Sequence, residues 1–291
     1  MDIEVLGTFS VRENGFSITP TAPKPRQVLA LLALHADRVV PVSALMEELW
    51  GANPPRSGRT TLQTYVLQLR ELITLAAEKS EAQQALGEGE RRAAKDVLVT
   101  MPGGYLLSSG DGCSDVRTFE HLAGLGYRAM DAGDFAGAAR QLRDALTLWS
   151  GTAFADVQAG AQLEMETKRL EESRLCALEK RIEAELRLGR HREALAELTV
   201  LVNRYRTHES LHAQFMLALY RSGRRSEALD VYRRLRATLV RGLGLEPSAG
   251  LRRLQQSILA ANDEPAAELS GSPKAAAHAV HAAKERLAPV R

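Results

Sequence analysis

One face of the segment 56–73 carries side chains whose chemistry suits contact with a nucleic acid. Its hydrogen-bonding residues cluster when the segment is placed on a helix: Thr60, Thr61, Gln63, Thr64 and Gln68. Amide and hydroxyl groups pair with base edges, and guanidinium groups pair with phosphates. Three arginines flank this face: Arg56, Arg59 and Arg70. The opposite face is an apolar stripe that any amphipathic helix would show, so the neighbouring elements must decide between a base-reading helix and a merely solvated one.

The elements predicted before this helix are a small sheet and two helices. The opening of the chain alternates in hydrophobicity as strands do, and an Asn-Gly pair at 14–15 predicts a hairpin turn. Pro25 is well placed to begin a helix, and His35 would close it as a favourable C-terminal charge. A second helix is predicted from an N-cap at Ser43 to a stop at Gly51.

A polar insertion and a hairpin follow the polar-faced helix. The insertion spans residues 75–96, and its first half is compatible with a longer helix. The segment 97–107 reads VLVTMPGGYLL and predicts two short strands, with Tyr105 anchored in the core. The order sheet, helix, helix, helix, hairpin is that of a winged helix-turn-helix. In that fold the third helix enters the major groove and the wing touches the adjacent backbone or minor groove.

The second half of the chain predicts helices only. Gly189 and Gly223 lie 34 residues apart, each between an amphipathic helix and a second helix with small residues. A helix-turn-helix period of 34 residues is typical of tetratricopeptide repeats, and Gly133 marks an earlier copy of the same pattern. An ordinary Ala-rich helical bundle is the alternative.

We therefore predict an α+β winged helix-turn-helix domain followed by an all-α, tetratricopeptide-like domain. The predicted limits are 1–110 for the first and 111–261 for the second. The tail 262–291 is rich in Ala, Pro, Ser and Lys without apolar periodicity, and we expect it to be disordered.

Composition narrows the choice of function only slightly. The 291 residues have a net charge of +2, which by itself does not indicate a nucleic-acid partner. Between residues 24 and 70, however, six basic residues stand against three acidic ones, enough for a local basic surface. The two cysteines are too few for a disulfide scaffold. No apolar run is long enough to span a bilayer and the N-terminus lacks a signal peptide, so a cytoplasmic location without membrane contact is expected.

The chain resembles the Streptomyces antibiotic regulatory proteins in their small form, over residues 3–260. The resemblance rests on EVLGTFSV, KPRQVLALLALHADRVVPVSALMEELWG, RTTLQTYVLQLR and PGGYLL in the first half. In the second half it rests on LEESRLCALEKRIEAELRLGRH, MLALYRSGRRSEAL and LGLEPSAGLRRL. It implies an OmpR-type domain, like the effector domain of two-component regulators, followed by a bacterial transcriptional activation domain. The implied role is activation of a secondary-metabolite (antibiotic) gene cluster.

The same resemblance implies partners and site residues. The partners would be double-stranded promoter DNA with direct repeats near the −35 region, bound by two subunits, and RNA polymerase holoenzyme through its sigma and core subunits. The phosphate contacts would be Lys24, Arg26, Arg56, Arg59 and Arg70. The wing would include Thr100, Met101, Gly103, Gly104 and Tyr105. The polymerase-contacting loop would include Gly51, Asn53, Pro54 and Pro55.

Two departures qualify these implications. The family often places an arginine near the wing tip, where this chain has Met101, so insertion of the wing into the minor groove is in question. The insertion 75–96 is longer than usual, and its Arg91, Arg92 and Lys95 could either contact phosphates or be solvated.

Other functions receive weaker signals. His208-Glu209-Ser210-Leu211-His212 fits the zinc-peptidase motif H-E-x-x-H, but it is expected to open a helix as exposed polar residues, and no third ligand stands out. No cofactor motif or catalytic constellation is present, so we expect neither an enzyme nor a bound cofactor. A repeat-type interaction scaffold and a repressor remain the alternatives to an activator.

Overall fold

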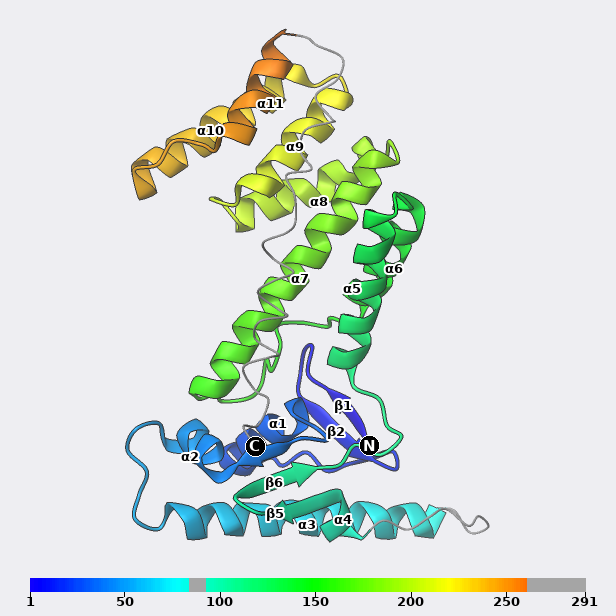
Figure 1. Ribbon diagram of the computed structural model, residues 1–291, viewed down its shortest axis with the longest axis vertical. Coiled ribbons are helices and arrows are strands. Elements are labelled where there is room, and N and C mark those ends of the chain that lie inside the picture. The colour runs from blue at the N-terminus through cyan, green and yellow to red at the C-terminus, as the bar shows by residue number, and fades with distance from the viewer. Residues whose placement is uncertain (84–92, 261–291) are drawn as a thin grey trace, which may run out of the picture. The chain divides into compact units, whose positions relative to one another are not determined.

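A computed structural model of the chain describes residues 1–83 and 93–260 (Figure 1). Arg91 and Arg92 and the tail 262–291, for which expectations were stated, lie outside the described residues. The chain forms two compact units, 1–181 and 182–291, and each is described by itself.

The chain opens with a small antiparallel sheet. Strands β1 (Asp2–Glu4), β2 (Ser10–Glu13) and β3 (Phe16–Ser17) pair in that order. Asn14 and Gly15 have φ angles of 50° and 83°, as the turn between β2 and β3 requires. The hairpin predicted from the Asn-Gly pair is confirmed.

Two helices and a short strand follow. They are α1 (Pro23–Leu34), β4 (Val39–Pro41) and α2 (Val42–Trp50). The prediction that Ser43 caps α2 is wrong: Pro41 holds the N-cap position, and the Val42 N–H donates to the Gly103 carbonyl of the wing turn at 2.9 Å. His35 does end α1, but burial lowers its pKa, so the neutral imidazole is favoured over the helix-end charge that was predicted.

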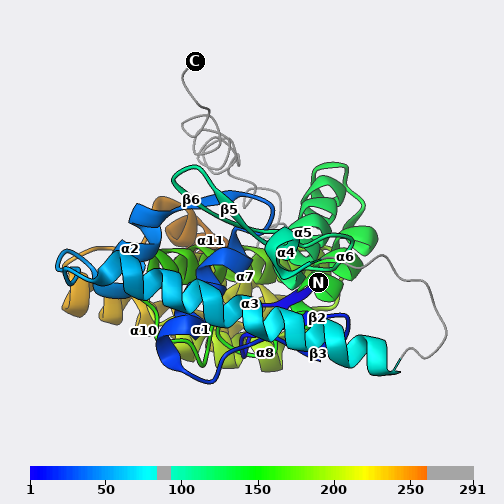
Figure 2. The same ribbon diagram turned by 90° about the horizontal axis from the view of Figure 1, so that it is seen from below.

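The third helix, α3 (Gly58–Gln83), is 26 residues long and therefore about 39 Å from end to end. It runs along the outside of the unit beside α1 (Figure 2). Its C-terminal turns include residues 75–83, the first part of the insertion 75–96. Ala76 and Ser80 in these turns are buried. The helical extension that the sequence allowed is thus present.

A second sheet forms the wing. After the short helix α4 (Ala94–Val97), strands β5 (Leu98–Met101) and β6 (Gly104–Leu107) form a hairpin, and the sheet order is β4-β6-β5. A Cβ atom at Gly104 would lie 2.3 Å from the Val40 carbonyl oxygen, so the pairing of β4 with β6 requires glycine here. Tyr105 is buried as expected.

The first unit also includes helices α5 (Asp115–Asp131) and α6 (Phe135–Thr147) and most of α7 (Ala161–Arg187). The loop between α6 and α7 lies against the opening sheet, where the Ser150 N–H donates to Leu6 and the Phe154 N–H donates to Val5. One hydrophobic core therefore runs from Ile3 to Ala177. The compact units divide at residue 181, because these contacts bind α5, α6 and the start of α7 to the winged helix. The domain limit at residue 110 stays a prediction.

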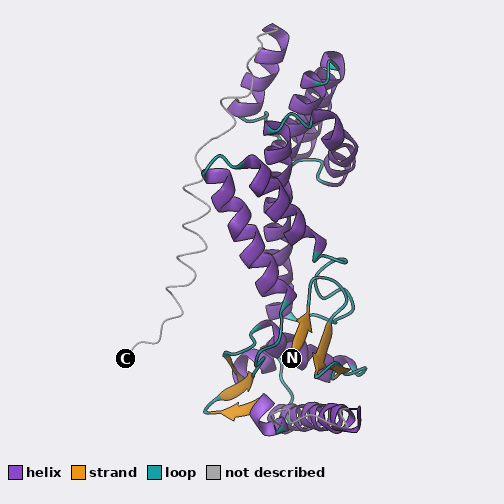
Figure 3. Ribbon diagram, turned by 90° about the vertical axis from the view of Figure 1, so that its right-hand side faces the viewer, coloured by secondary structure: helices purple, strands orange, loops and turns teal. Residues whose placement is uncertain are grey.

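The second unit is helical throughout its described residues. It contains the end of α7, then α8 (His191–Arg204), α9 (Glu209–Arg221), α10 (Arg225–Leu243) and α11 (Ala249–Ala260). Among the described residues, strands occur only in the first unit (Figure 3). The three repeat glycines join α5 to α6, α7 to α8 and α9 to α10, and all have φ angles between 76° and 81°. The helical hairpins predicted from these glycines are confirmed.

Candidate nucleic-acid interface

Helix α3 separates its residues into a buried and an exposed face. The buried residues include Leu62, Val66, Leu69, Ile73 and Ala76. The predicted base-reading residues Thr60, Gln63, Thr64 and Gln68 are all exposed. Figure 2 views the helix from its outer side, where no other described element of this unit covers it. The side chains with base-pairing chemistry are thus brought together on one open surface.

Thr61 lies at the edge of this exposed face. It is half-buried, and its hydroxyl donates to the Ser57 carbonyl at 3.1 Å. The Thr64 hydroxyl donates in the same way to Thr60, but Thr64 is exposed, and the lone pairs of its oxygen remain acceptors.

A leucine stands on this face that the sequence analysis did not single out. The side chain of Leu67 is 57% exposed, although α3 buries its other central leucines. Helical spacing places it next to Gln63 and Thr64. The sequence could have revealed its exposure, because helical spacing places Leu67 outside the apolar stripe of α3.

Arg70 was predicted to contact phosphate, but the structure uses it to join α3 to the wing. Its Nη2 donates to the Leu98 carbonyl and to Thr100 Oγ1, both at 2.8 Å, and its Nε donates to Leu98 as well. These bonds use three of the five N–H donors of the guanidinium group and leave the two of Nη1. These contacts join α3 to the wing, and the contact of Arg70 with phosphate stays a prediction.

Lys24 and Arg26 are also used within the fold, and their contact with phosphate stays a prediction. The Lys24 ammonium donates to the Leu49 carbonyl at 2.8 Å, at the end of α2. Arg26 donates to the Phe9 carbonyl at 2.9 Å and is ion-paired with Asp156. Both cations hold elements of the first unit together.

Arg56 and Arg59 are placed where they could contact phosphate, as predicted. Both are exposed, and neither has a hydrogen bond or ion pair with any described residue. The first turn of α3 contains no acidic residue, so the partial positive charge of the helix N-terminus adds to theirs. Of the five predicted phosphate contacts, these two arginines are the ones without a partner among the described residues.

The loop before α3 is open to solvent throughout. Each of the residues expected to contact polymerase is exposed: Gly51, Asn53, Pro54 and Pro55. The Asn53 N–H donates to the Trp50 carbonyl at 3.3 Å, and the Gly58 N–H donates to Pro55 at 2.8 Å. The loop is therefore held at both ends while its side chains remain free to meet a partner.

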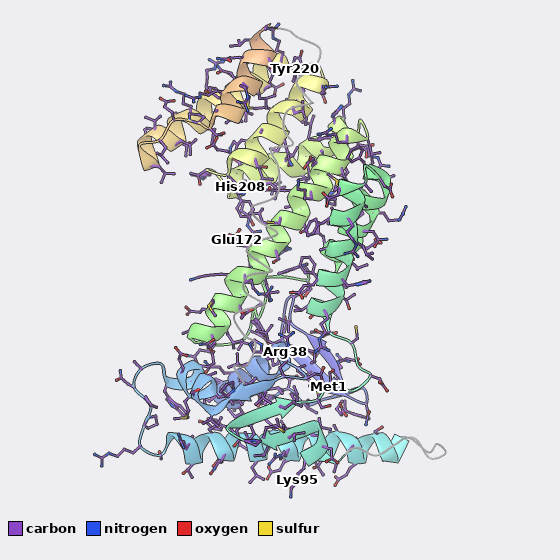
Figure 4. All side chains as sticks on the ribbon, in the orientation of Figure 1. Met1, Arg38, Lys95, Glu172, His208 and Tyr220 are labelled. Atoms are coloured by element: carbon purple, nitrogen blue, oxygen red, sulfur yellow. The ribbon has the colours of Figure 1, made fainter. Side chains whose placement is uncertain are left out.

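The wing hairpin presents little charge at its tip. Thr100, Met101 and Gly103 are exposed, with Met101 at 37%, whereas Gly104 and Tyr105 are buried. Lys95 is exposed on α4, which lies close to α3 (Figure 4). It is the one member of the basic cluster in the insertion that falls within the described residues.

Glu48 links the winged-helix part of this unit to α7, a role that sequence reasoning missed. Its carboxylate, only 2% exposed, accepts from the N–H groups of Gln162 at 2.9 Å and Leu163 at 3.0 Å. It also accepts from the Gly160 N–H and the Gln27 amide. These backbone donors are the unsatisfied N–H groups at the start of a helix, so a carboxylate from α2 caps α7.

The H-E-x-x-H segment belongs to the packing of the second unit. His208 precedes α9 and Glu209 begins it, as predicted, but His212 is buried and not exposed. His212 Nδ1 lies 3.0 Å from the His208 carbonyl, and burial lowers the pKa of His212. Within the described ranges, no group of three or more His, Cys, Asp or Glu side chains is arranged to hold a metal ion.

The fold and this surface define a class of protein: a winged-helix transcriptional regulator joined to a helical-repeat domain. Residues 18–89 match the family described as "Transcriptional regulatory protein, C terminal". Residues 114–259 match the "Bacterial transcriptional activator domain". Among the described residues, no helix combines the length and apolar character needed to cross a membrane.

Individual relatives agree with both matches. The chain is 53% identical to the regulatory protein DnrI of Streptomyces peucetius, over 90% of this chain and 93% of that protein. It is 36% identical to the regulatory protein AfsR of Streptomyces coelicolor, over 92% of this chain but only 25% of AfsR. The structure of Mycobacterium tuberculosis EmbR in complex with a low-affinity phosphopeptide matches with a TM-score of 0.82 and 32% identity. That match covers 98% of this chain and 71% of EmbR. The chain belongs to the Streptomyces antibiotic regulatory protein family of transcriptional regulators.

Proposed function

We propose that this chain activates transcription of a secondary-metabolite gene cluster by binding specific promoter DNA. The observation that carries the proposal is the exposed face of α3, where neutral hydrogen-bonding side chains gather on a helix oriented beside a wing. The family membership and the 53% identity to DnrI support the regulatory role.

In the proposed complex, α3 enters the major groove with Gln63 and Thr64 among its base-reading residues. Arg56 and Arg59 contact phosphates where the helix begins, and Met101 at the wing tip makes only shallow contact. Two phosphate-contacting arginines give one subunit modest affinity, so two subunits bind direct repeats near the −35 region. Repeats spaced by one helical turn, about 10 base pairs, would place both subunits on the same side of the duplex.

The loop at residues 51–56 is proposed to contact RNA polymerase holoenzyme, because its side chains are exposed while its ends are fixed. We further propose that the protein acts in the cytoplasm, at the nucleoid, and that it catalyses no reaction. The concave surfaces that helical repeats commonly form favour protein partners for the second half of the chain.

Genome-wide binding by the full chain, paired with transcript levels in a deletion strain, tests the proposal. We expect bound promoters to contain direct repeats and their transcripts to fall in the deletion strain. A rise of those transcripts would indicate repression, and no preference for any promoter would refute sequence-specific binding. Asn53→Ala tests the loop: it should leave duplex affinity unchanged and lower transcription with purified holoenzyme. Equal transcription by Asn53→Ala and the unaltered chain would contradict the loop assignment.

A further inference from the structure

Leu67 is one of two exposed leucines on α3, the other being Leu75. Leu67 is 57% exposed near the middle of the face that carries Gln63 and Thr64. A leucine kept in water forgoes the stabilisation that burial would give, so a ligand that covered it would gain that stabilisation on binding. Single exposed leucines are common on proteins, and the surroundings of this one therefore matter.

Those surroundings are polar on every side along the helix. One turn before Leu67 lie Gln63 and Thr64, and one turn after it lie Arg70 and Glu71. Protein-docking surfaces usually present contiguous apolar patches. The other exposed leucine of α3, Leu75 at 49%, lies eight residues away, about 12 Å along the axis. An isolated apolar group within a ring of hydrogen-bonding groups does not fit such a patch.

It does fit the edge of a thymine. In the major groove the C5-methyl of thymine is an apolar group set among hydrogen-bond donors and acceptors. We infer that Leu67 is a specificity-determining residue that packs on a thymine methyl in the bound site. The inference rests on the proposed function, because it requires α3 to lie in the major groove, and it adds a preference for thymine that hydrogen-bonding residues alone would not supply.

The first experiment determines a preferred site by selecting random duplexes with the full chain. A selected site with a thymine at a fixed position in each half-site is the expected result. A selected site without any such thymine would overturn the inference and leave the proposed function intact. The absence of any selected sequence would overturn both.

The second experiment removes the methyl from the DNA. Each thymine of the selected site is replaced by uracil, which keeps base pairing but lacks the C5-methyl, and Kd is measured at one fixed salt concentration. For the unaltered chain, one replacement should weaken binding about fourfold, the value of one buried methyl group. For Leu67→Ala, the same replacement should have almost no effect.

Leu75→Ala is the matched control, since it removes an equally exposed leucine two turns along the same helix. It should keep the preference for thymine over uracil. The inference is overturned if Leu67→Ala keeps that preference or if Leu75→Ala also loses it. Both leucines are exposed, so thermal unfolding of the two variants should match that of the unaltered chain.

Discussion

Replacing Glu48 should show how strongly the stability of the winged-helix part of the first unit depends on its contact with α7. The side chain is 2% exposed, and its carboxylate accepts from the N–H groups of Gly160, Gln162 and Leu163. Glu48→Ala would leave these three donors without their acceptor. At ~1 kcal/mol for each orphaned N–H, the free energy of unfolding should fall by about 3 kcal/mol.

Glu48→Gln is the more informative change because it keeps the shape of the side chain. One oxygen still accepts, but the new amide nitrogen places its hydrogens against backbone N–H groups. We expect a loss of about 1–3 kcal/mol in the free energy of unfolding. The neighbouring Glu47→Gln is the control: Glu47 is exposed, and among the described residues its carboxylate accepts only from the Gln162 side chain at 2.8 Å. Its effect should stay within about 0.5 kcal/mol.

Denaturant unfolding followed by tryptophan fluorescence measures this difference directly. Both tryptophans of the chain, Trp50 and Trp149, lie in the first unit, so the signal reports on the unit that contains Glu48. The unfolding midpoint of Glu48→Gln should fall clearly below that of Glu47→Gln. Equal midpoints for the two variants would refute the conclusion that Glu48 caps α7.

Three further predictions follow from other contacts. Gln63→Ala should relax base preference at one position at a cost of about 1–3 kcal/mol of binding free energy, whereas Arg59→Ala should weaken binding to all duplexes alike. Binding of both variants to a panel of single-base variants of the site checks this. The same pattern of affinities for both variants would contradict the assignment of Gln63 to bases and Arg59 to phosphate. Gly104→Ala should destabilise the first unit, since its Cβ would lie 2.3 Å from the carbonyl of Val40; an unchanged melting temperature would argue against the tight pairing of β4 with β6. Burial lowers the pKa of His212, so its contribution to stability is present above pH 6.5 and is lost as pH falls through the folded-state pKa. His212→Asn should therefore reduce the acid dependence of the melting temperature, and an identical pH profile would count against this.

The sequence predicted well those features that depend on local chemistry. The Asn-Gly turn, the glycines between repeat helices and the exposed face of α3 all follow from residues within a few positions of one another. Backbone conformation at glycine and helical periodicity are local properties, so they can be read without knowledge of the fold. The recognition of the winged-helix order rested on these elements.

The features that the sequence did not predict concern side chains whose partners lie far away in the sequence. Arg70 meets Leu98 and Thr100, 28 and 30 positions later, and Glu48 meets Leu163 across 115 positions. Nothing near Arg70 distinguishes a guanidinium that binds a carbonyl inside the fold from one that waits for a phosphate. Ser43 shows the same limit: it has the chemistry of an N-cap, but the N-cap is Pro41, two residues earlier, where the Val42 N–H donates to the wing turn.

Several charged side chains of the first unit are paired within the fold, and this changes how much each is expected to contribute to DNA binding. Of the acidic residues between positions 24 and 70, Glu48 is buried in the cap of α7 and Asp37 is ion-paired with Arg117. A count of charges along this stretch therefore overstates the exposed, unpaired charge, both acidic and basic. Among the predicted phosphate contacts, only Arg56 and Arg59 lack a partner within the described residues, so we expect weak sequence-independent attraction of a single subunit to DNA. In the proposed complex, discrimination between promoters would then come from the exposed face of α3, and sufficient affinity from the binding of two subunits side by side.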